Sequence, residues 1–362
     1  MKNWEANIRR VTPYTPGEQP REPRMIKLNT NENPYPPSPA VEQAAKELGA
    51  DRLRLYPDPA SSVLTEALAG FYRRKPEEIF VGVGSDDVLA MAFQTFFQSG
   101  KPILFPDITY SFYPVWAELF RIPWKSPALD SEFRIVKEDY FGENGGIVFP
   151  NPNAPTGIYM ELSEVEEILQ KNRDVIVIVD EAYVDFAGPS AIELVDRYDN
   201  LLVVQTFSKS RSMAGMRIGF AVGNPELIRY LNDVKYSFNS YTMSQAALEL
   251  GAAAVGDETY FRETLGKIIR VREETKRELS ALGFVFPDSR ANFIFASHES
   301  CPAEELFEAL KAEHIYVRHF HGPRIGNYLR ITIGTEEQMA ALLAFLRDYL
   351  KEHSGKRRKT DS

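Results

Sequence analysis

The chain has 362 residues, which is long enough to bury a large core and is expected to form two domains. A hydrophobic fraction of 44% and a charged fraction of 26% are typical of a globular protein and exclude a disordered chain. The net charge of -9 argues against nucleic acid as the main partner, because binding a phosphate backbone needs an excess of lysine and arginine.

Several features bear on the compartment. The single cysteine, Cys301, cannot form an internal disulfide, which fits a reducing environment. The first residues, "MKNWEANIRRV", lack the apolar stretch of a signal peptide, and no apolar run approaches the length that spans a membrane. We therefore expect a cytoplasmic protein without membrane or nucleic-acid partners. The one basic cluster, "KRRK" at 356–359, lies in a tail that we expect to be disordered over 353–362.

The N-terminal region is rich in proline and polar residues, as in "TPYTPGEQPREPR" and "NENPYPPSP", and predicts an extended arm. From about residue 60, helical and strand-like patterns alternate. Helices are predicted at 60–73, 86–98, 110–120 and 162–171, and strands rich in Val, Ile and Phe at 78–83, 102–106, 146–150, 174–180, 201–206 and 217–222. Apolar strands separated by helices indicate an α/β fold with a mostly parallel central sheet flanked by helices.

A long helical stretch over about 243–282 follows, with charges along one side. It is expected to lead into a smaller C-terminal α/β domain with the strands "FVF", "NFIFAS", "YVRHF" and "YLRITIG". We expect a large domain over 46–265, a small domain over 266–352, and an N-terminal arm over 1–45 that also contributes to the small domain.

Functional groups in such a sheet usually follow the carboxyl ends of its strands. Four segments stand there: "VGVGSDD" (81–87), "NPNAPTG" (151–157), "VIVDEAY" (177–183) and "TFSKSRSMAGMRIGF" (206–220). The first is a glycine turn that could present N–H groups to a phosphate, although Asp86 could simply cap the helix. Asp180 could likewise cap a loop or face a ligand. Lys209 lies between two apolar runs, where burying an ammonium group is unfavourable.

Taken in chain order, these segments resemble the fold-type I pyridoxal phosphate (PLP) enzymes, and among them the class I and II aminotransferases. The likeness covers nearly the whole chain: the glycine turn, Tyr110, "NAPTG", Asp-x-x-Tyr, Ser-x-Lys, Arg217 and Arg330. "LNTNENPYPPSP", "RLYPDP", "DEAYVDF", "SKSRSMAGMRIGF" and "NYLRITIGT" resemble the histidinol-phosphate aminotransferase family. This resemblance implies transamination of L-histidinol phosphate with 2-oxoglutarate to imidazole acetol phosphate and L-glutamate, in histidine biosynthesis.

The resemblance also implies three catalytic residues. Lys209 would bind the PLP aldehyde covalently and, once the substrate displaces it, carry a proton between Cα and the cofactor C4′. Its amine must be neutral to react, and the apolar surroundings lower its pKa. Asp180 would face the pyridine nitrogen, and Tyr183 would donate a hydrogen bond to the O3′ oxygen of the cofactor.

Further residues would bind the cofactor. Tyr110 would stack on the ring. The phosphate would be bound by the backbone at Ser85 and Asp86, by the hydroxyls of Thr206 and Ser208, and by Arg217. Most relatives have an asparagine directly before Pro-Thr-Gly, where this chain has Ala154. We expect Asn153 to take over the contact with O3′, or Tyr183 to make it alone.

The substrate site is expected to be shared between subunits. Tyr56, in "RLYPDP", would reach the phosphate of the cofactor from the neighbouring subunit, which implies a homodimer with shared active sites. Tyr14 of the partner, with Arg318 and Arg330, would bind the substrate anions. No metal is expected.

Two other classes of protein fit the sequence less well, and two related PLP enzymes fit it equally. A nicotinamide-dependent dehydrogenase could use "VGVGSDD" as its phosphate loop, but the third glycine of that fingerprint is missing. A non-catalytic regulator with a PLP-enzyme fold would need a DNA-binding segment, and the sequence offers no basic helical unit. An aromatic amino acid aminotransferase and a threonine-phosphate decarboxylase both stay open, because motifs for the cofactor do not distinguish their substrates.

Overall fold

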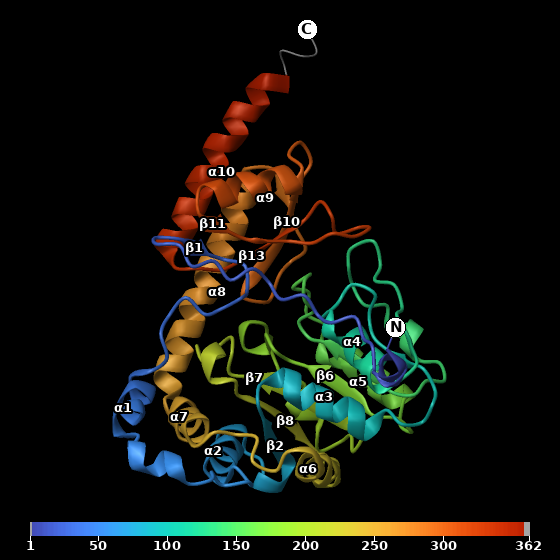
Figure 1. The fold of residues 1–362 in the computed structure, drawn as a ribbon. Helices are drawn as coiled ribbons and strands as arrows, with labels where there is room; N and C mark the ends of the chain where they lie inside the picture. Colours follow the sequence, from blue (N-terminus) through green and yellow to red (C-terminus); the bar gives the residue numbers. More distant parts are fainter. Residues whose placement is uncertain (1, 358–362) are drawn as a thin grey trace.

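The computed structural model describes residues 2–357, with side chains through residue 352. Figure 1 shows two stacked units, a lower one built on a seven-stranded sheet and an upper one with a four-stranded sheet. Helix α8 (Glu258–Ala281) runs from the lower unit into the upper one. The α/β fold predicted from the sequence, a large domain with a smaller C-terminal one, is confirmed. Because α8 passes through residue 265 without a break, the expected domain boundary falls inside one helix.

The large sheet has the strand order β2-β8-β7-β6-β5-β3-β4. Its strands are β2 (Ile79–Gly82), β3 (Ile103–Leu104), β4 (Trp124–Lys125), β5 (Ile147–Pro150), β6 (Val177–Asp180), β7 (Leu201–Thr206) and β8 (Gly219–Gly223). β8 pairs antiparallel with β2 and β7, and the other pairs are parallel. The connection from β7 to β8 is a loop with a short 3-10 turn rather than a crossover helix, so β8 returns in the opposite direction.

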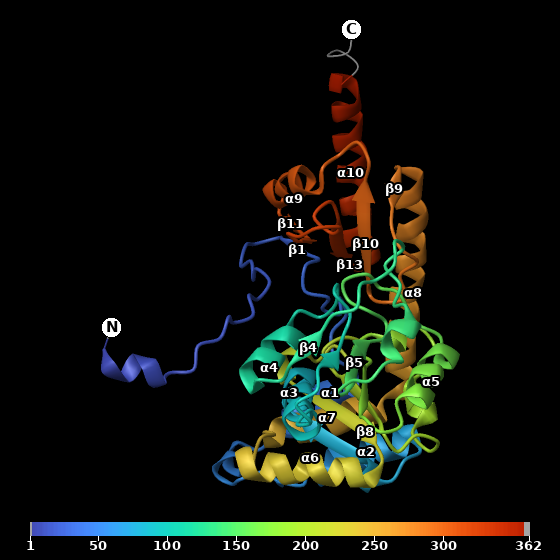
Figure 2. The same cartoon turned by 90° about the vertical axis from the view of Figure 1, so that its right-hand side faces the viewer.

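Helices cover both faces of this sheet. On one face lie α3 (Ser85–Phe96), α4 (Phe112–Phe120) and α6 (Pro225–Phe238), and on the other α1 (Pro39–Glu47), α2 (Ser62–Tyr72), α5 (Leu162–Lys171) and α7 (Gln245–Gly256). Figure 2 shows α3 and α4 on one side of the strands and α5 on the other. β6 is buried from both sides: Ile178 belongs to the core that includes α3 and α4, and Val177 and Val179 belong to the core that includes α5 and α7.

The upper unit is built from residues 284–357, the end of α8 and one N-terminal strand. It contains β9 (Phe284–Val285), β10 (Phe293–His298), α9 (Ala303–Ala312), β11 (Ile315–Tyr316), β12 (Arg318–His319), β13 (Leu329–Thr332) and α10 (Glu336–Arg357). Its sheet has the antiparallel order β12-β13-β10-β9. The N-terminal strand β1 (Ile26–Lys27) pairs in parallel with β11, which brings the start of the chain to the small domain.

The helix predicted over 243–282 is two helices. α7 ends at Gly256, and Asp257 begins α8 by accepting a hydrogen bond from the backbone of Tyr260. α6 was missed, although Asn224 caps it and Pro225 occupies its first position. The strand predicted from 217 begins at Gly219, because Arg217 has a left-handed backbone with φ of 52°.

The two ends of the chain also differ from expectation. The predicted extended arm contains α1 from Pro39 onward, which packs against α7. The tail expected to be disordered from residue 353 is helical through Arg357, as the end of α10, and residues 358–362 lie outside the described part of the chain. Among residues 2–357, no helix combines the length and apolar character needed to cross a membrane.

Candidate active site

A cavity of about 190 Å³ lies at the carboxyl ends of β5, β6 and β7. Most of the residues expected at the cofactor come together in its wall: Ser85, Asp86, Tyr110, Asp180, Tyr183, Thr206, Ser208, Lys209 and Arg217. The remaining wall is formed by Thr30, Glu32, Pro150, Ala154, Ala182 and Ala214. Parallel strands deliver their carboxyl ends to one edge of the sheet, which is why segments far apart in sequence meet here.

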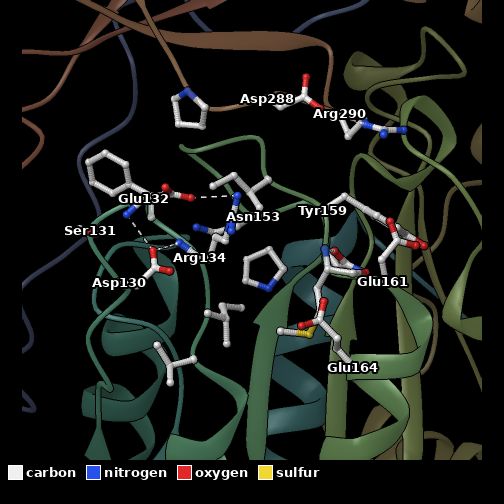
Figure 3. Close-up of a pocket in the computed structure, with 18 of the residues that line it drawn as sticks. Asp130, Ser131, Glu132, Arg134, Asn153, Tyr159, Glu161, Glu164, Asp288 and Arg290 are labelled. Carbon is white, nitrogen blue, oxygen red and sulfur yellow. Dashed lines mark hydrogen bonds and ion pairs between the residues drawn. The ribbon is translucent and has the colours of Figure 1, made fainter.

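A second, larger cavity of about 920 Å³ lies elsewhere, between the two domains (Figure 3). Figure 3 shows acidic side chains around it, namely Asp130, Glu132, Glu161, Glu164 and Asp288, with Arg134 and Arg290. No lysine stands among the described residues that line it. An excess of carboxylates does not suit a phosphorylated ligand, so the smaller cavity is the better candidate for an anionic cofactor.

Lys209 enters the small cavity from the loop after β7 and is partly exposed within it. Its Nζ donates a hydrogen bond to the backbone oxygen of Thr30 at 3.1 Å. Burial lowers the pKa of Lys209 to about 8, and the positive charge of Arg330 adds to the effect. The lysine therefore has a substantial neutral, nucleophilic fraction near neutral pH.

Asp180 ends β6 and is buried in the wall of the cavity. Its Oδ2 accepts a hydrogen bond from the hydroxyl of Tyr113 at 2.9 Å, whereas its Oδ1 has no partner within the described protein. Burial raises the pKa of Asp180 to about 7, against the hydrogen bond from Tyr113, which lowers it. A buried carboxylate oxygen without a partner suits a protonated pyridine nitrogen, which would supply both a hydrogen bond and a positive charge.

Tyr183 and Tyr110 complete the polar wall. The hydroxyl oxygen of Tyr183 accepts a hydrogen bond from Nδ2 of Asn31 at 2.9 Å, and burial raises the pKa of Tyr183. Tyr110 donates its hydroxyl to Oδ1 of Asp86 at 2.7 Å. Two phenols thus border the same space as the lysine and the aspartate.

One end of the cavity is built for an anion. α3 begins there at Ser85, so its first N–H groups are free to bind a ligand. Ser208 lies 3.0 Å from the hydroxyl of Thr206 and 3.5 Å from Nη1 of Arg217. The guanidinium also pairs with Asp86 at 3.3 Å. Two hydroxyls, an arginine and a helix N-terminus together fit a phosphate group.

Close backbone packing holds this end in shape. A Cβ on Gly219 would lie 2.3 Å from the backbone of Gly84 and of Ser85. Gly84 itself has φ of 84°, which glycine adopts without strain. The glycines therefore let β8 and the turn before α3 approach each other behind the anion site.

Asn153 is not brought into the small cavity. Its Nδ2 donates to the backbone oxygen of Ile108 and to Thr156, and its Oδ1 accepts from Thr109, so its amide groups are occupied. It lines the large cavity instead. Of the two expectations for the contact with O3′, the arrangement favours Tyr183 alone, because Ala154 and not Asn153 lines the small cavity.

Two arginines lie side by side on the small domain. Arg318 on β12 pairs in register with Arg330 on β13, and both guanidinium groups lie over the ring of Phe320. Nη2 of Arg330 donates to the backbone oxygen of Asn29, while its Nε is buried without a partner. Among residues 2–352, neither arginine forms an ion pair with a carboxylate. Both charges are thus available to an anion.

Tyr56 and Tyr14 lie outside the cavity of the single chain. Tyr56 is 82% exposed and stacks on Tyr241, with ring centroids 4.6 Å apart. Tyr14 stacks on Phe112 at 4.2 Å. Their expected roles require a second subunit, which a single chain does not test.

Sequence reasoning missed several residues at the site. Tyr113 lies three positions after Tyr110, one helical turn on, and that spacing was the available signal. The segment 29–33 crosses over the cavity: Asn31 contacts Tyr183, and Asn33 donates to the backbone oxygens of Lys209 and Ser210, each at 3.1 Å. Within the described residues, no group of three or more His, Cys, Asp or Glu side chains could hold a metal ion.

The sequence matches proteins of one family over nearly its whole length. Residues 23–346 match the family model for class I and II aminotransferases. The histidinol-phosphate aminotransferase of Lactococcus lactis subsp. cremoris is 50% identical over 349 residues, covering 96% of this chain and 98% of that protein. The histidinol-phosphate aminotransferase of Pseudomonas putida is 54% identical over 340 residues, covering 94% of this chain and 98% of that protein.

Solved structures share the fold. A histidinol-phosphate aminotransferase from Sinorhizobium meliloti, solved in complex with pyridoxal-5′-phosphate, has a TM-score of 0.83 at 22% identity and covers 90% of this chain and 91% of that one. The enzyme of the same name from Clostridium acetobutylicum has a TM-score of 0.84 at 22% identity and covers 91% and 100%.

Proposed function

Because the chain belongs to the class I and II aminotransferases, and among them to the histidinol-phosphate aminotransferase family, we propose that it transfers the amino group of L-histidinol phosphate to 2-oxoglutarate. The products are imidazole acetol phosphate and L-glutamate, a step of histidine biosynthesis, and the cofactor is PLP. The observation that carries the proposal is a single cavity lined by both Lys209 and Asp180, whose Oδ1 has no hydrogen-bond partner. The chain is also 50% identical to a histidinol-phosphate aminotransferase. The single cysteine supports a cytoplasmic location.

PLP supplies an electron sink that allows the Cα–H bond of the amino substrate to break. Lys209 would be the residue that moves the proton: with PLP bound, its Nζ would take the proton from Cα of the substrate and deliver it to C4′. With a pKa of about 8, roughly one lysine in ten is neutral at pH 7, and the fraction rises with pH.

Other residues hold the cofactor in place. Oδ1 of Asp180 would keep the ring nitrogen protonated, while Tyr113 fixes the other carboxylate oxygen. Tyr183 would donate to O3′, and Tyr110 would cover the ring. The phosphate would be bound by the backbone N–H groups of Ser85 and Asp86 in the first turn of α3, and by Thr206, Ser208 and Arg217.

The substrate pocket must accept different anions in turn. Histidinol phosphate carries a phosphate and no carboxylate, whereas glutamate carries two carboxylates. Arg330 and Arg318 suit both, because a guanidinium group forms paired hydrogen bonds with either anion, and neither arginine is neutralised by a carboxylate. Tyr14 of the partner subunit adds a hydroxyl to the phosphate end.

The test of this function is a half-reaction assay with the PLP form of the enzyme against histidinol phosphate, phenylalanine, tyrosine and threonine phosphate. Histidinol phosphate is expected to react with the highest kcat/KM. A preference for phenylalanine would show an aromatic amino acid aminotransferase, and release of carbon dioxide from threonine phosphate would show a decarboxylase.

In the same assay, Arg318→Ala is expected to weaken the binding of histidinol phosphate more than that of glutamate, whereas Arg330→Ala should weaken the binding of both.

A homodimer with shared active sites is part of the proposal. The N-terminal arm runs out from the small domain along one side of the molecule, as Figure 2 shows, and contacts the large domain at α4, where Tyr14 stacks on Phe112. Large apolar side chains are exposed in the single chain around and beyond the stacked pair of Tyr56 and Tyr241: Leu53, Leu55 and Phe238. Exposed apolar side chains gathered in this way support a protein–protein interface. Light scattering at micromolar concentration is expected to give twice the chain mass of 41.1 kDa.

A mixing experiment tests whether the dimer shares its sites. Tyr56→Ala and Lys209→Ala are expected to be inactive alone and to recover about a quarter of the wild-type activity when refolded together, since half of the dimers are mixed and each has one intact site. The control pair is Lys209→Ala with Asp180→Ala. Both residues line one cavity of one chain, so mixing them should restore nothing. Full activity in a monomer would contradict the shared site.

A further inference from the structure

The hydroxyl of Tyr183, which lines the cavity, is also hydrogen-bonded to Asn31. Asn31, which is 1% exposed, donates Nδ2 to the hydroxyl oxygen of Tyr183 at 2.9 Å. A phenol is both donor and acceptor, and this contact uses an acceptor position of the oxygen. The phenolic proton is therefore left to be donated elsewhere, and Tyr183 lines the cavity that also holds Lys209 and Asp180.

The orientation of the Asn31 amide is set by the small domain. The hydroxyl of Thr332 accepts a hydrogen bond from the backbone N–H of Asn31 and donates its own proton to Oδ1 of Asn31, each at 3.0 Å. Because Oδ1 faces Thr332, Nδ2 faces Tyr183. Asn292 fixes the same residue by donating to the backbone oxygen of Asn31 at 3.0 Å. Each polar atom of Asn31 in this network therefore has a defined partner.

The turn around Ala154 adds no side-chain donor to the cavity. Ala154, which lies in the wall, has no polar side chain, and the amide of Asn153 points away. The charged groups that act on Tyr183 are Asp180, Asp86, Arg330 and Lys209, whose Nζ lies 5.8 Å from the Tyr183 ring centroid. With no donor from Ala154 or Asn153, the hydroxyl of Tyr183 is a donor in the cavity wall whose oxygen is already bound by Asn31.

We propose that Asn31 is a positioning residue: its amide holds the hydroxyl of Tyr183 so that the phenolic proton is directed into the cavity, toward O3′ of the cofactor. This inference rests on the proposed function, because it assumes that PLP occupies the cavity. Asn31 acts through Tyr183 and does not itself reach the reacting atoms. Since its partners Asn292 and Thr332 belong to the small domain, the small domain controls a hydrogen bond in the large one.

The test measures the pH midpoint of the visible absorbance change of the PLP-bound enzyme, without substrate. A hydrogen bond donated to O3′ favours its deprotonated form, so loss of the donor raises the midpoint. Asn31→Gly is the suitable variant, because Asn31 has φ of 57°, which glycine tolerates, and only the amide is removed. We expect the midpoint to rise by about one unit and PLP to bind about tenfold more weakly.

A double-mutant cycle tests whether Asn31 acts through Tyr183. Tyr183→Phe is expected to raise the midpoint at least as much, and Asn31→Gly in that background should add nothing. An unchanged midpoint in Asn31→Gly, or a shift that adds in full to that of Tyr183→Phe, would overturn the inference. Should Asn31→Gly not fold, Asn31→Asp keeps the shape but removes the donor, and must shift the midpoint in the same direction.

A matched control separates this effect from loss of stability. Asn200 is a buried amide at the amino end of β7, where its Nδ2 donates to the backbone oxygens of Asn172 and Val175. Asn200→Ala should lower the melting temperature and leave the midpoint unchanged. A wild-type protein that takes up no PLP would refute the proposed function, whereas PLP uptake with an insensitive midpoint in Asn31→Gly and Asn31→Asp would refute only the role of Asn31.

Discussion

Lys209→Ala is expected to lower kcat by about 10⁴-fold or more, because one residue both binds the cofactor covalently and carries the proton. PLP should still bind through its phosphate, since Ser208, Arg217 and the first turn of α3 are unchanged. Borohydride reduction of the wild-type enzyme, followed by peptide mapping, is expected to place the cofactor label on Lys209. A label on another lysine would contradict the assignment.

The control for this experiment is another lysine in a partly apolar environment. Lys235 on α6 is buried, donates Nζ to the backbone oxygen of Pro59 at 2.7 Å, and has a pKa that burial lowers. It lies outside the small cavity. Lys235→Met should therefore leave the borohydride label and kcat near wild type, although burial lowers the pKa of both lysines.

Asp180→Asn is expected to lower kcat by about 10²- to 10³-fold, or roughly 3 to 4 kcal/mol of barrier. The substitution keeps size and hydrogen-bonding reach but removes the negative charge that holds a proton on the ring nitrogen. Stopped-flow measurement of the first half-reaction would give this loss directly. A kcat near wild type would show that Asp180 is not the partner of the pyridine nitrogen.

Glu181→Gln provides the matched control. Glu181 is the next residue, is equally buried, and burial raises its pKa to about 7 as well. Its oxygens, however, accept from Ser190, the backbone of Ala191 and Gln205, away from the cavity. Neutralising Glu181 should leave the half-reaction rate within a few-fold of wild type.

The same Asp180 variant should stabilise the cofactor-free protein. The folded-state pKa of about 7 is above the ordinary value of 3.8, so the folded state retains a proton that the unfolded chain has lost. Ionisation of Asp180 therefore reduces stability as pH rises from about 4 to 7. Asp180→Asn is expected to raise the melting temperature of the cofactor-free protein at pH 8 and to change it little at pH 4. This opposition of stability and activity is typical of a residue placed for function.

The position of the cofactor-binding residues could be predicted from the sequence because these residues follow the ends of predicted strands. Asp180 closes β6 and Lys209 comes just after β7, and adjacent parallel strands necessarily bring such residues to one edge. The alternation of apolar runs also predicted the layered fold. The direction of β8 was not predictable from its composition, because a buried strand reads the same in either direction.

Contacts between distant segments could not be predicted. Asn31 and Tyr183 are 152 positions apart, and Asn33 and Lys209 are 176 apart, so no local pattern links them. The orientation of the Asn153 side chain could not be predicted either. Ala154, the next residue, lines the cavity, whereas Asn153 is held away from it by hydrogen bonds with Ile108 and Thr109.

The pairing of β1 with β11 has a consequence for how the protein is made. A ribosome releases residues 26–33 early, yet their partners at 292–332 emerge near the end of synthesis. In a nascent chain that already contains Asp180, Tyr183 and Lys209, the segment over the cavity cannot adopt its final position until β11 and β13 have been synthesised. Truncation before residue 332 would thus leave every catalytic residue in place and the cavity without its cover. A fragment must therefore extend through Thr332 before the segment over the cavity can find its partners.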